Sequence, residues 1–362
     1  MSGGVDSSVA CLLLKQRGYD VVGLTMKLLP NPPSQDVARA PCCTLEMAQD
    51  AMRICHSLGI PHYTIDLVEE FSESVIFPFV REYSLARTPN PCLQCNRVMK
   101  FGHLLWKARE LGCEYIATGH YARVRHRDSH QSRALLLRGV DRKKDQSYAL
   151  YQLTQDELGH SLFPLGDLTK DEVRRIAHEA GLRTADKSES QEICFVTGSY
   201  REFLEERGLE VEPGEIVDTS GKVLGRHAGL PFYTIGQRKG LGVAGGRPLY
   251  VVDLDRERNA VVVGTRSEAY SMGCVVEGLN LIAEERLKGP VRGTCMVRYR
   301  GKEVDATMEP LPERPEELTS AIIRFDSPEF AVTPGQSAVL YQGDLVYGGG
   351  VIARRLGGVR ST

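Results

Sequence analysis

The sequence has 362 residues, of which 42% are hydrophobic and 25% charged, with a formal net charge of −2. This length allows two or three domains, and the balanced charge neither indicates nor excludes a nucleic-acid-binding protein, because a basic face can be offset by acidic residues elsewhere. No apolar run reaches the length of a membrane span and no signal peptide opens the chain, so we expect a cytoplasmic protein. The ten cysteines are too dilute for an extracellular disulfide scaffold, and we expect most of them to be packing or incidental surface thiols.

Residues 1–197 alternate strand-like and helical segments. A loop, SGGVDSS (2–8), leads into the helix-spaced VACLLLKQRG (9–18). Strands are predicted at 19–26 and 61–67 with a helix at 44–59 between them, and a helix–strand unit follows over 101–120. This order predicts an α/β domain with a doubly wound parallel sheet, in which ligands bind beyond the carboxyl ends of the strands.

After residue 198 the sequence becomes rich in glycine and short alternating runs. This pattern predicts a small β-rich central domain over 198–268 and a C-terminal β-barrel over 269–362, where short strands are separated by turn residues.

The opening loop has the composition of an anion-binding site. Its glycines leave backbone N–H groups open to a ligand, its serines add donors, and the helix behind it favours negative charge. The alternative is an ordinary glycine-rich turn with serine caps. The sequence lacks Gly-Lys-Ser/Thr, so it is not a Walker A loop.

The loop resembles the PP-loop of the N-type ATP pyrophosphatases, which cleave ATP between the α- and β-phosphates. The resemblance implies an N-terminal PP-loop (HUP-like) domain and cofactors ATP and Mg²⁺, the latter held in part by Asp6. The implied ATP-binding residues are Ser2, Gly3, Gly4, Val5, Asp6, Ser7 and Ser8. Such a loop normally follows a buried strand, whereas this chain starts at the loop, which indicates a misassigned start or a truncated sequence.

Further stretches resemble one group of PP-loop enzymes, the tRNA-specific 2-thiouridylases of the MnmA family. In that family's order they are NPCLQCNRVMKF (90–101), EYIATGHYAR (114–123), KKDQSYALYQL (143–153), KSESQEICFV (187–196) and YTIGQRKGLG (233–242). The resemblance implies ATP-dependent transfer of sulfur to C2 of uridine 34 in the Lys, Glu and Gln tRNAs. It implies two partners, tRNA and a sulfur donor such as a cysteine desulfurase or a sulfur-relay protein, and the C-terminal barrel is expected to contact the tRNA.

The same matching assigns roles to single residues. Cys95 corresponds to the nucleophilic cysteine and Cys194 to the cysteine that carries a persulfide. Met26 and Gly119 would line the ATP site, although a methionine at a strand end is often core packing. The implied contacts with tRNA or the target base are Asn90, Pro91, Cys92, His120, Lys144, Asp145, Gln146, Tyr299, Arg300 and Gln336. Lys100 and Arg97 could lower the pKa of the Cys95 thiol if they face it.

The pair Cys92-Leu-Gln-Cys95 departs from the family, much of which has Asp in place of Cys92. Three thiolates, from Cys92, Cys95 and Cys194, can hold a [4Fe–4S] cluster by three irons, an arrangement that resembles other tRNA thiolases. We favour this cluster over a persulfide relay between Cys95 and Cys194. A zinc site would want a fourth ligand, and no second C-x-x-C is present.

Three other interpretations remain. A PP-loop synthetase or amidotransferase acting on a small metabolite would share the loop, but no glutaminase domain is recognisable. A non-catalytic RNA-binding protein leaves the intact loop and the cysteines without a role. A structural or metal-storing thiol protein leaves the nucleotide loop unexplained.

Overall fold

The computed structural model describes residues 1–30, 45–128, 132–187, 193–196, 198–243, 246–311 and 319–357. Its contacts divide the chain into two units. The first unit contains Met1–Ile76, Pro91–Ser199 and Asp344–Val346, and the second contains Phe77–Asn90, Tyr200–Gly343 and Tyr347–Thr362. No helix within the described ranges is long and apolar enough to cross a membrane.

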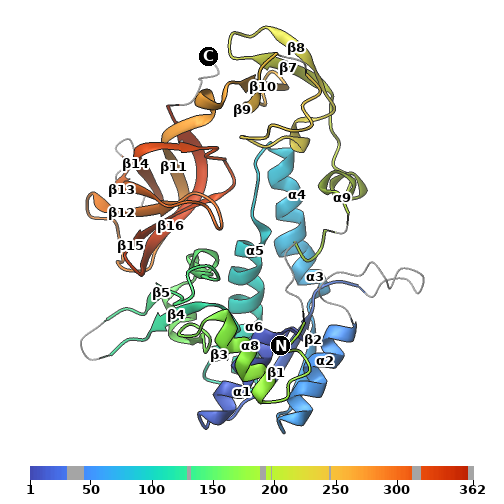
Figure 1. The fold of residues 1–362 in the computed structure, drawn as a ribbon, viewed down its shortest axis with the longest axis vertical. Coiled ribbons are helices and arrows are strands. Elements are labelled where there is room, and N and C mark those ends of the chain that lie inside the picture. The colour runs from blue at the N-terminus through green and yellow to red at the C-terminus, as the bar shows by residue number, and fades with distance from the viewer. Residues whose placement is uncertain are drawn as a thin grey trace. The chain divides into compact units, whose positions relative to one another are not determined.

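The first unit is an α/β structure built around short parallel strand pairs (Figure 1). Strand β1 runs parallel to β2, and β3 runs parallel to β6. The antiparallel hairpin of β4 and β5 pairs with β16 through Leu137 and Leu345. The strands are β1 (Gly23–Lys27), β2 (His62–Asp66), β3 (Ile116–Ala117), β4 (Ala122–Arg125), β5 (Leu135–Arg138) and β6 (Ser161–Leu162).

The helices of the first unit pack on one another and on these strands. The first helix contacts α8, and α2 packs on both β1 and β2. The helices are α1 (Val5–Gln16), α2 (Leu45–Ser57), α3 (Val68–Phe71), α5 (Pro91–Gln94), α6 (Leu104–Glu110), α7 (Gln155–Gly159) and α8 (Lys170–Glu179), with π-helical segments η2 (Ser72–Ile76) and η3 (Cys95–His103) and a 3₁₀ turn η4 (Ser147–Leu150). Val5 and Val9 of α1 share a core with Val173 and Ala177 of α8, which fixes the start of α1.

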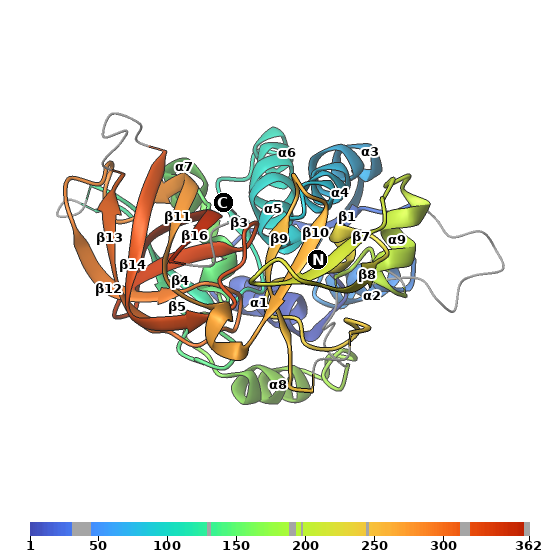
Figure 2. The same cartoon turned by 90° about the horizontal axis from the view of Figure 1, so that it is seen from above.

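The second unit is mostly β-structure. A four-stranded sheet has the order β8-β7-β10-β9, and six strands form a closed barrel in the order β11-β14-β13-β12-β15-β16, with β16 pairing back to β11 (Figure 2). The sheet strands are β7 (Gly214–Asp218), β8 (Val223–His227), β9 (Tyr250–Asp255) and β10 (Ala260–Gly264). The barrel strands are β11 (Tyr270–Leu281), β12 (Val291–Met296), β13 (Val304–Pro310), β14 (Ser320–Phe330), β15 (Ser337–Gln342) and β16 (Leu345–Leu356).

Helices α4 (Phe77–Ser84) and α9 (Tyr200–Glu206) also belong to the second unit, together with the 3₁₀ turns η5 (Leu230–Phe232) and η6 (Arg266–Ala269). An aromatic cluster joins the two helices, since Phe79 lies 6.1 Å from Phe203 and 6.3 Å from Tyr200 between ring centroids. The predicted fold class is therefore confirmed: an α/β N-terminal part, a small β-rich part and a C-terminal barrel.

Closure of the barrel depends on a close backbone approach at Gly293. A Cβ added there would lie 2.1 Å from the carbonyl oxygen of Tyr341 in β15. We expect Gly293→Ala to destabilise the second unit by about 1–3 kcal/mol, the usual cost of forcing atoms into a packed site. Urea denaturation followed by circular dichroism measures this. Gly289→Ala is the matched control, because a Cβ there would meet nothing within 4 Å; equal stability of both variants would contradict the expectation.

Candidate active site

The glycine-serine loop at the start of α1 is held by its own side chains and by α2. Gly3 has a φ of +65°, and a Cβ added there would lie 2.5 Å from the carbonyl oxygen of Met47, so only glycine fits. The hydroxyl groups of Ser2 and Ser7 lie 3.1 Å apart. Ser8 is buried and its hydroxyl donates to the Gly4 carbonyl at 2.8 Å, and the half-buried Ser7 hydroxyl donates to the same carbonyl at 3.2 Å.

The loop is fastened to strand β1. The Thr25 hydroxyl donates to the Met1 carbonyl at 2.9 Å, and the Met1 amine donates to the Leu24 carbonyl. Met26, which follows in the same strand, is partly exposed. Met26, which was expected to line the ATP site, therefore lies in the strand to which the loop is hydrogen-bonded through Met1.

Gly119 lies directly against the loop backbone. A Cβ added at this position would stand 2.8 Å from the carbonyl carbon of Asp6 and 2.9 Å from the nitrogen of Ser7. Any larger residue would displace the first turn of α1. The structure thus brings together Gly119 and the loop residues, which the family resemblance had assigned to one ATP site.

The Asp6 carboxylate is engaged by two buried groups. Lys170, at the start of α8, donates to both of its oxygens at 2.7 and 2.9 Å, and the Tyr121 hydroxyl donates to Oδ1 at 2.8 Å. The Lys170 ammonium also lies 5.7 Å from the centre of the Tyr121 ring. This ion pair ties the loop to α8, so an Mg²⁺ ion held by Asp6 would have to share the carboxylate with Lys170.

The two cysteines of the C-x-x-C pair lie on a single helical run. Pro91 begins α5, a position that suits proline because the first helical N–H has no partner. Cys92 lies in α5, and Cys95 begins the π-helical segment η3. Asn96 is buried and donates to the Ala149 carbonyl at 3.0 Å, which anchors the run. π-Helical insertions are frequent at functional sites.

Both thiols are harder to ionise than a free cysteine. Desolvation by the surrounding protein raises the pKa of Cys95 and of Cys92, although the Cys92 residue still reaches solvent. Lys100 lowers both pKa values electrostatically, but by less than desolvation raises them. The lysine therefore acts on the thiols in the expected direction, while the net pKa shift is upward.

Cys194 lies in the described segment 193–196, in the same unit. The neighbouring Phe195 packs edge-to-face on Phe71 of α3, with ring centroids 5.6 Å apart. Helix α3 in turn contacts η3, the segment that begins with Cys95. Cys194 is half-buried in this neighbourhood.

The three cysteines do not form a ready-made metal site. Over the ranges that the structure describes, no group of three or more Cys, His, Asp or Glu side chains is arranged to hold a metal ion. Cys92 is close enough to Cys95 to raise the pKa of the Cys95 thiol, but the positions of Cys92, Cys95 and Cys194 do not fit a [4Fe–4S] cluster. The cluster stays a prediction.

His120 is buried and uncharged. Its ring packs against the rings of Phe101 and Phe163, which also contact each other, and its Nδ1 is 2.7 Å from the Thr118 hydroxyl. Burial lowers the pKa of His120 well below its usual value, and the positive charge of Lys100 adds to this effect. A contact from this ring to tRNA would therefore be a neutral hydrogen bond rather than an ion pair.

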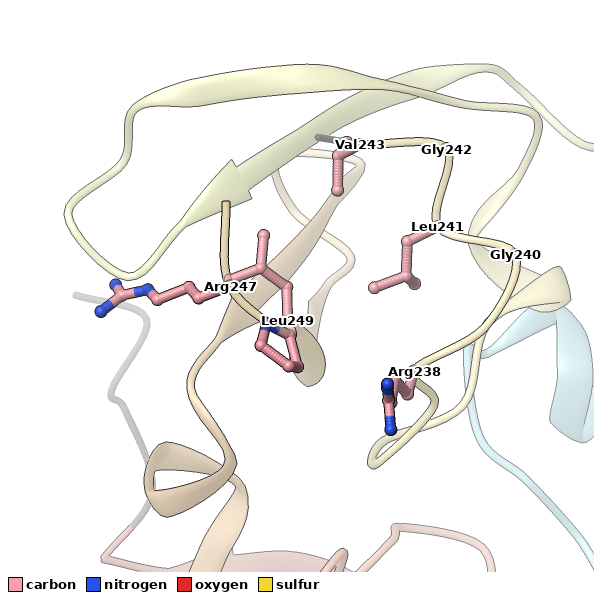
Figure 3. Close-up of a pocket in the computed structure, with 8 residues that line it drawn as sticks. Arg238, Gly240, Leu241, Gly242, Val243, Arg247 and Leu249 are labelled. Carbon is pink, nitrogen blue, oxygen red and sulfur yellow. The ribbon is translucent and has the colours of Figure 1, made fainter. Parts of the chain in front are cut away.

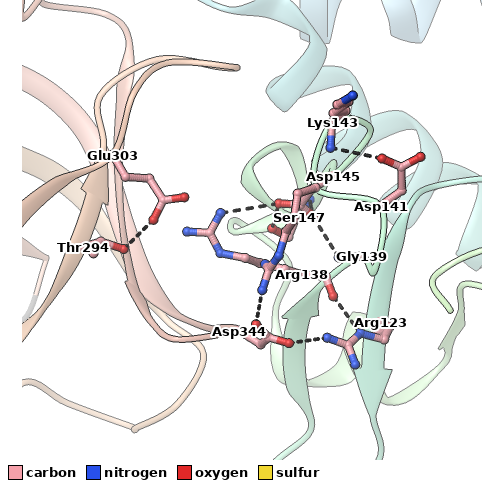
Figure 4. A network of polar contacts seen from close by, with 11 residues as sticks. Arg123, Arg138, Gly139, Asp141, Lys143, Asp145, Ser147, Thr294, Glu303 and Asp344 are labelled. Carbon is pink, nitrogen blue, oxygen red and sulfur yellow. Dashed lines mark hydrogen bonds and ion pairs between the residues drawn. The ribbon is translucent and has the colours of Figure 1, made fainter. Parts of the chain in front are cut away.

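The loop expected to contact tRNA, residues 144–146, is held in shape by hydrogen bonds that its own side chains accept (Figure 4). Asp145 accepts hydrogen bonds from the backbone of Gly139 at 2.9 Å and the hydroxyl of Ser147 at 2.9 Å. Gln146 accepts from the Tyr121 N–H at 3.0 Å. These two side chains thus shape the loop, and Lys144 is its partly exposed cation.

The remaining predicted contacts lie in the second unit: Asn90, Tyr299, Arg300 and Gln336. The Gln336 amide donates to the Thr88 carbonyl at 2.7 Å, so it holds the segment that ends at Asn90. Arg300 is exposed, with a φ of +56°, and its guanidinium lies 5.2 Å from the centre of the Tyr299 ring.

The second unit also contains a pocket of about 290 Å³ beside strand β9 (Figure 3). Leu241 points into it, whereas the Arg247 side chain points away. Its lining residues are Arg238, Gly240, Leu241, Gly242, Val243, Arg247, Pro248 and Leu249. None of them is among the predicted site residues.

Sequence reasoning missed three residues at the loop: Tyr121, Lys170 and Lys187. Tyr121 and Lys187 lie in stretches that were singled out for other residues, so a signal was present. Lys170 lies in no such stretch, and only the packing of α8 on α1 brings it to Asp6.

We expect Lys170→Met to lower the free energy of unfolding by about 1–3 kcal/mol. Removing one partner of a buried ion pair costs about 3–5 kcal/mol, and the 31% exposure of the Asp6 side chain reduces that cost. Urea denaturation of Lys170→Met, Asp6→Asn and the double variant measures the coupling. Additive losses would show that the pair contributes nothing.

We expect Lys100→Met to slow alkylation of Cys92 and Cys95 by iodoacetamide about two- to tenfold at pH 8, because losing a nearby cation raises a thiol's pKa further and lowers the thiolate fraction. For both proteins the rate should rise with pH up to the thiol pKa. Lys107→Met, on the surface of α6, is the control. Unchanged rates in Lys100→Met would contradict the electrostatic account.

Three family models match the chain: the tRNA methyl transferase HUP domain over residues 1–198, the tRNA methyl transferase PRC-barrel domain over 201–265, and the aminomethyltransferase β-barrel domain over 271–352. A solved U34-tRNA thiolase, NcsA from Methanococcus maripaludis with its [4Fe–4S] cluster, superposes with a TM-score of 0.32 at 17% identity, covering 57% of this chain and 62% of that one. This likeness is too low to support an argument.

Curated relatives are much closer. A protein of Moorella thermoacetica named tRNA-specific 2-thiouridylase MnmA is 52% identical over 97% of this chain and 98% of its own length. Proteins of the same name from Halothermothrix orenii and Symbiobacterium thermophilum are 48% and 47% identical, over 97% and 98% of this chain and 97% and 91% of their own lengths. The chain therefore belongs to the tRNA-specific 2-thiouridylase MnmA family.

Proposed function

We propose that this protein is an ATP-dependent tRNA 2-thiouridylase, which replaces the C2 oxygen of uridine 34 by sulfur in the Lys, Glu and Gln tRNAs. The observation that carries the proposal is that one unit holds both the glycine-serine loop, with Gly119 against it, and the helical run with Cys92 and Cys95. Membership of the MnmA family supports the same substrate.

The loop would bind the pyrophosphate part of ATP. Its backbone N–H groups and the Ser2 and Ser7 hydroxyls lie at the N-terminus of α1, where an anion is stabilised. Mg²⁺, when bound, would neutralise phosphate charge, with Asp6 as the carboxylate at hand. The uracil C2 oxygen attacks the α-phosphate, pyrophosphate leaves, and the C2 oxygen becomes part of an AMP leaving group.

Sulfur would then arrive as a persulfide on Cys194, supplied by a cysteine desulfurase or a sulfur-relay protein. The terminal sulfur attacks C2 and expels AMP. The Cys95 thiolate next attacks the Sγ of Cys194, which forms a Cys95–Cys194 disulfide and releases the C2=S product. A thiol reductant reopens the disulfide. Because desolvation raises the pKa of Cys95, this thiol must lose a proton during the reaction.

The tRNA would be held mainly through cations and one stacking surface. The exposed Arg300, whose guanidinium lies 5.2 Å from the centre of the Tyr299 ring, would offer with that ring a surface on which an unstacked base can rest. Exposed Arg142, which also pairs with Asp344, and exposed Lys143 directly precede the 144–146 loop and would contact phosphates, which makes binding weaken with salt.

The test is anaerobic purification with iron and sulfide analysis, followed by tRNA thiolation with ATP and a persulfide donor. We expect iron-free wild type to thiolate tRNA and release AMP, Cys95→Ser and Cys194→Ser to lose thiolation, and Cys92→Ala to retain most of it. About four irons and four sulfides per chain, lost in Cys92→Ala, would replace the relay by a cluster mechanism. Wild type that neither thiolates tRNA nor releases AMP would refute the proposed function.

A further inference from the structure

Lys187 places a second ammonium group at the nucleotide loop. Its Nζ donates to the Gly3 carbonyl at 3.1 Å and to Asp50 Oδ2, on α2, at 3.1 Å. The backbone of Lys187 is fixed, because its N–H donates to the carbonyl of the buried Thr184 at 3.1 Å. The side chain thus starts from a defined point and ends beside the loop.

The two lysines at the loop differ in how firmly they are held. Lys170 is buried, with 8% of its side chain exposed, and donates to both oxygens of Asp6. In the Lys187–Asp50 pair the side chains are 35% and 33% exposed, and pairs of this kind contribute little free energy. Lys170 is therefore a fixed support, whereas Lys187 can change partners.

The neighbouring residues keep the free-energy cost of such a change of partner low. Asp50 has a second cation, Arg53, whose Nη1 lies 3.4 Å from its Oδ1, so it does not lose all its partners when Lys187 turns away. An ammonium group has three donors, and Lys187 can keep the Gly3 carbonyl while it donates to a new acceptor. The polyphosphate of ATP carries more negative charge in total than one carboxylate that is shared with Arg53, and its hydrogen bonds with an ammonium group are charge-assisted.

We propose that Lys187 is a phosphate-binding residue of the nucleotide site, which exchanges Asp50 for the pyrophosphate part of ATP. This inference rests on the proposed use of ATP. It makes Asp50 a competitor for the lysine rather than a support of the site, and therefore gives the two partners of one ion pair opposite effects on binding.

The test is calorimetric titration of the full-length protein with Mg-ATP, inorganic pyrophosphate and AMP. We expect Lys187→Met to weaken ATP and pyrophosphate about ten- to a hundredfold, the loss of one hydrogen bond to a charged group, with AMP changed less than about twofold. Lys187→Arg should retain part of the affinity. Asp50→Asn should bind ATP as tightly as wild type or several-fold more tightly, and Lys107→Met serves as a surface-lysine control.

Weaker binding of ATP by Lys187→Met, without any loss of affinity in Asp50→Asn, would establish the exchange, because a structural ion pair would be damaged equally from either side. Equal weakening of all three ligands in both variants would make the pair structural and overturn the inference. Unchanged ATP affinity in Lys187→Met would also overturn it, while the proposed function would stand. Wild type that binds neither ATP nor pyrophosphate would refute the proposed function together with this inference.

Discussion

A loop binds an anion well only if its backbone N–H groups already point toward the binding site before the ligand binds. In this protein the ion pair between Asp6 and Lys170 holds the loop in such a fixed conformation. It fixes the first turn of α1 to the first turn of α8, and the Tyr121 hydroxyl completes the contact. Because Tyr121 lies two residues after Gly119 in sequence, its hydrogen bond to Asp6 also helps to hold the glycine against the loop. The Asp6 carboxylate thus links the loop both to α8 and to the segment that contains Gly119, in addition to the apolar core that α1 and α8 share.

The thiol site differs from the loop, because its reactive group has to change its protonation state during the proposed reaction. In the proposed relay Cys95 must ionise during sulfur transfer, yet desolvation raises the pKa of its thiol, and Lys100 offsets only part of this rise. A protonated thiol is protected from alkylation and oxidation while no substrate is bound. The proposed mechanism therefore combines a glycine-serine loop that is held in place before the nucleotide binds with a cysteine that stays protonated until its environment changes.

The α/β part, the β-rich part and the barrel could be predicted from the sequence, because strand and helix periodicities are local. The glycine-serine loop and the C-x-x-C pair could be recognised for the same reason. What could not be predicted depends on distant contacts: Lys170 meets Asp6 only through the packing of α8 on α1. The direction of the Cys95 pKa shift also escaped, since desolvation depends on burial that a sequence does not state. Gln336 and Asp145 look like polar surface residues in the sequence, yet their side chains hold backbone carbonyl and N–H groups in place.

These contacts separate the charged groups of the first unit into those that hold the structure in place and those that can bind a ligand. Charges that are buried and bidentate, such as Lys170 on Asp6, are costly to break and therefore serve as supports. Breaking an ion pair that is partly exposed and joined by one hydrogen bond, such as Lys187 with Asp50, costs little free energy. Such a charged group is therefore available to bind a ligand. The degree of burial, rather than the type of residue, separates the two lysines at the loop. This criterion places Lys187 among the groups that act on substrate and Lys170 among those that keep the loop in shape.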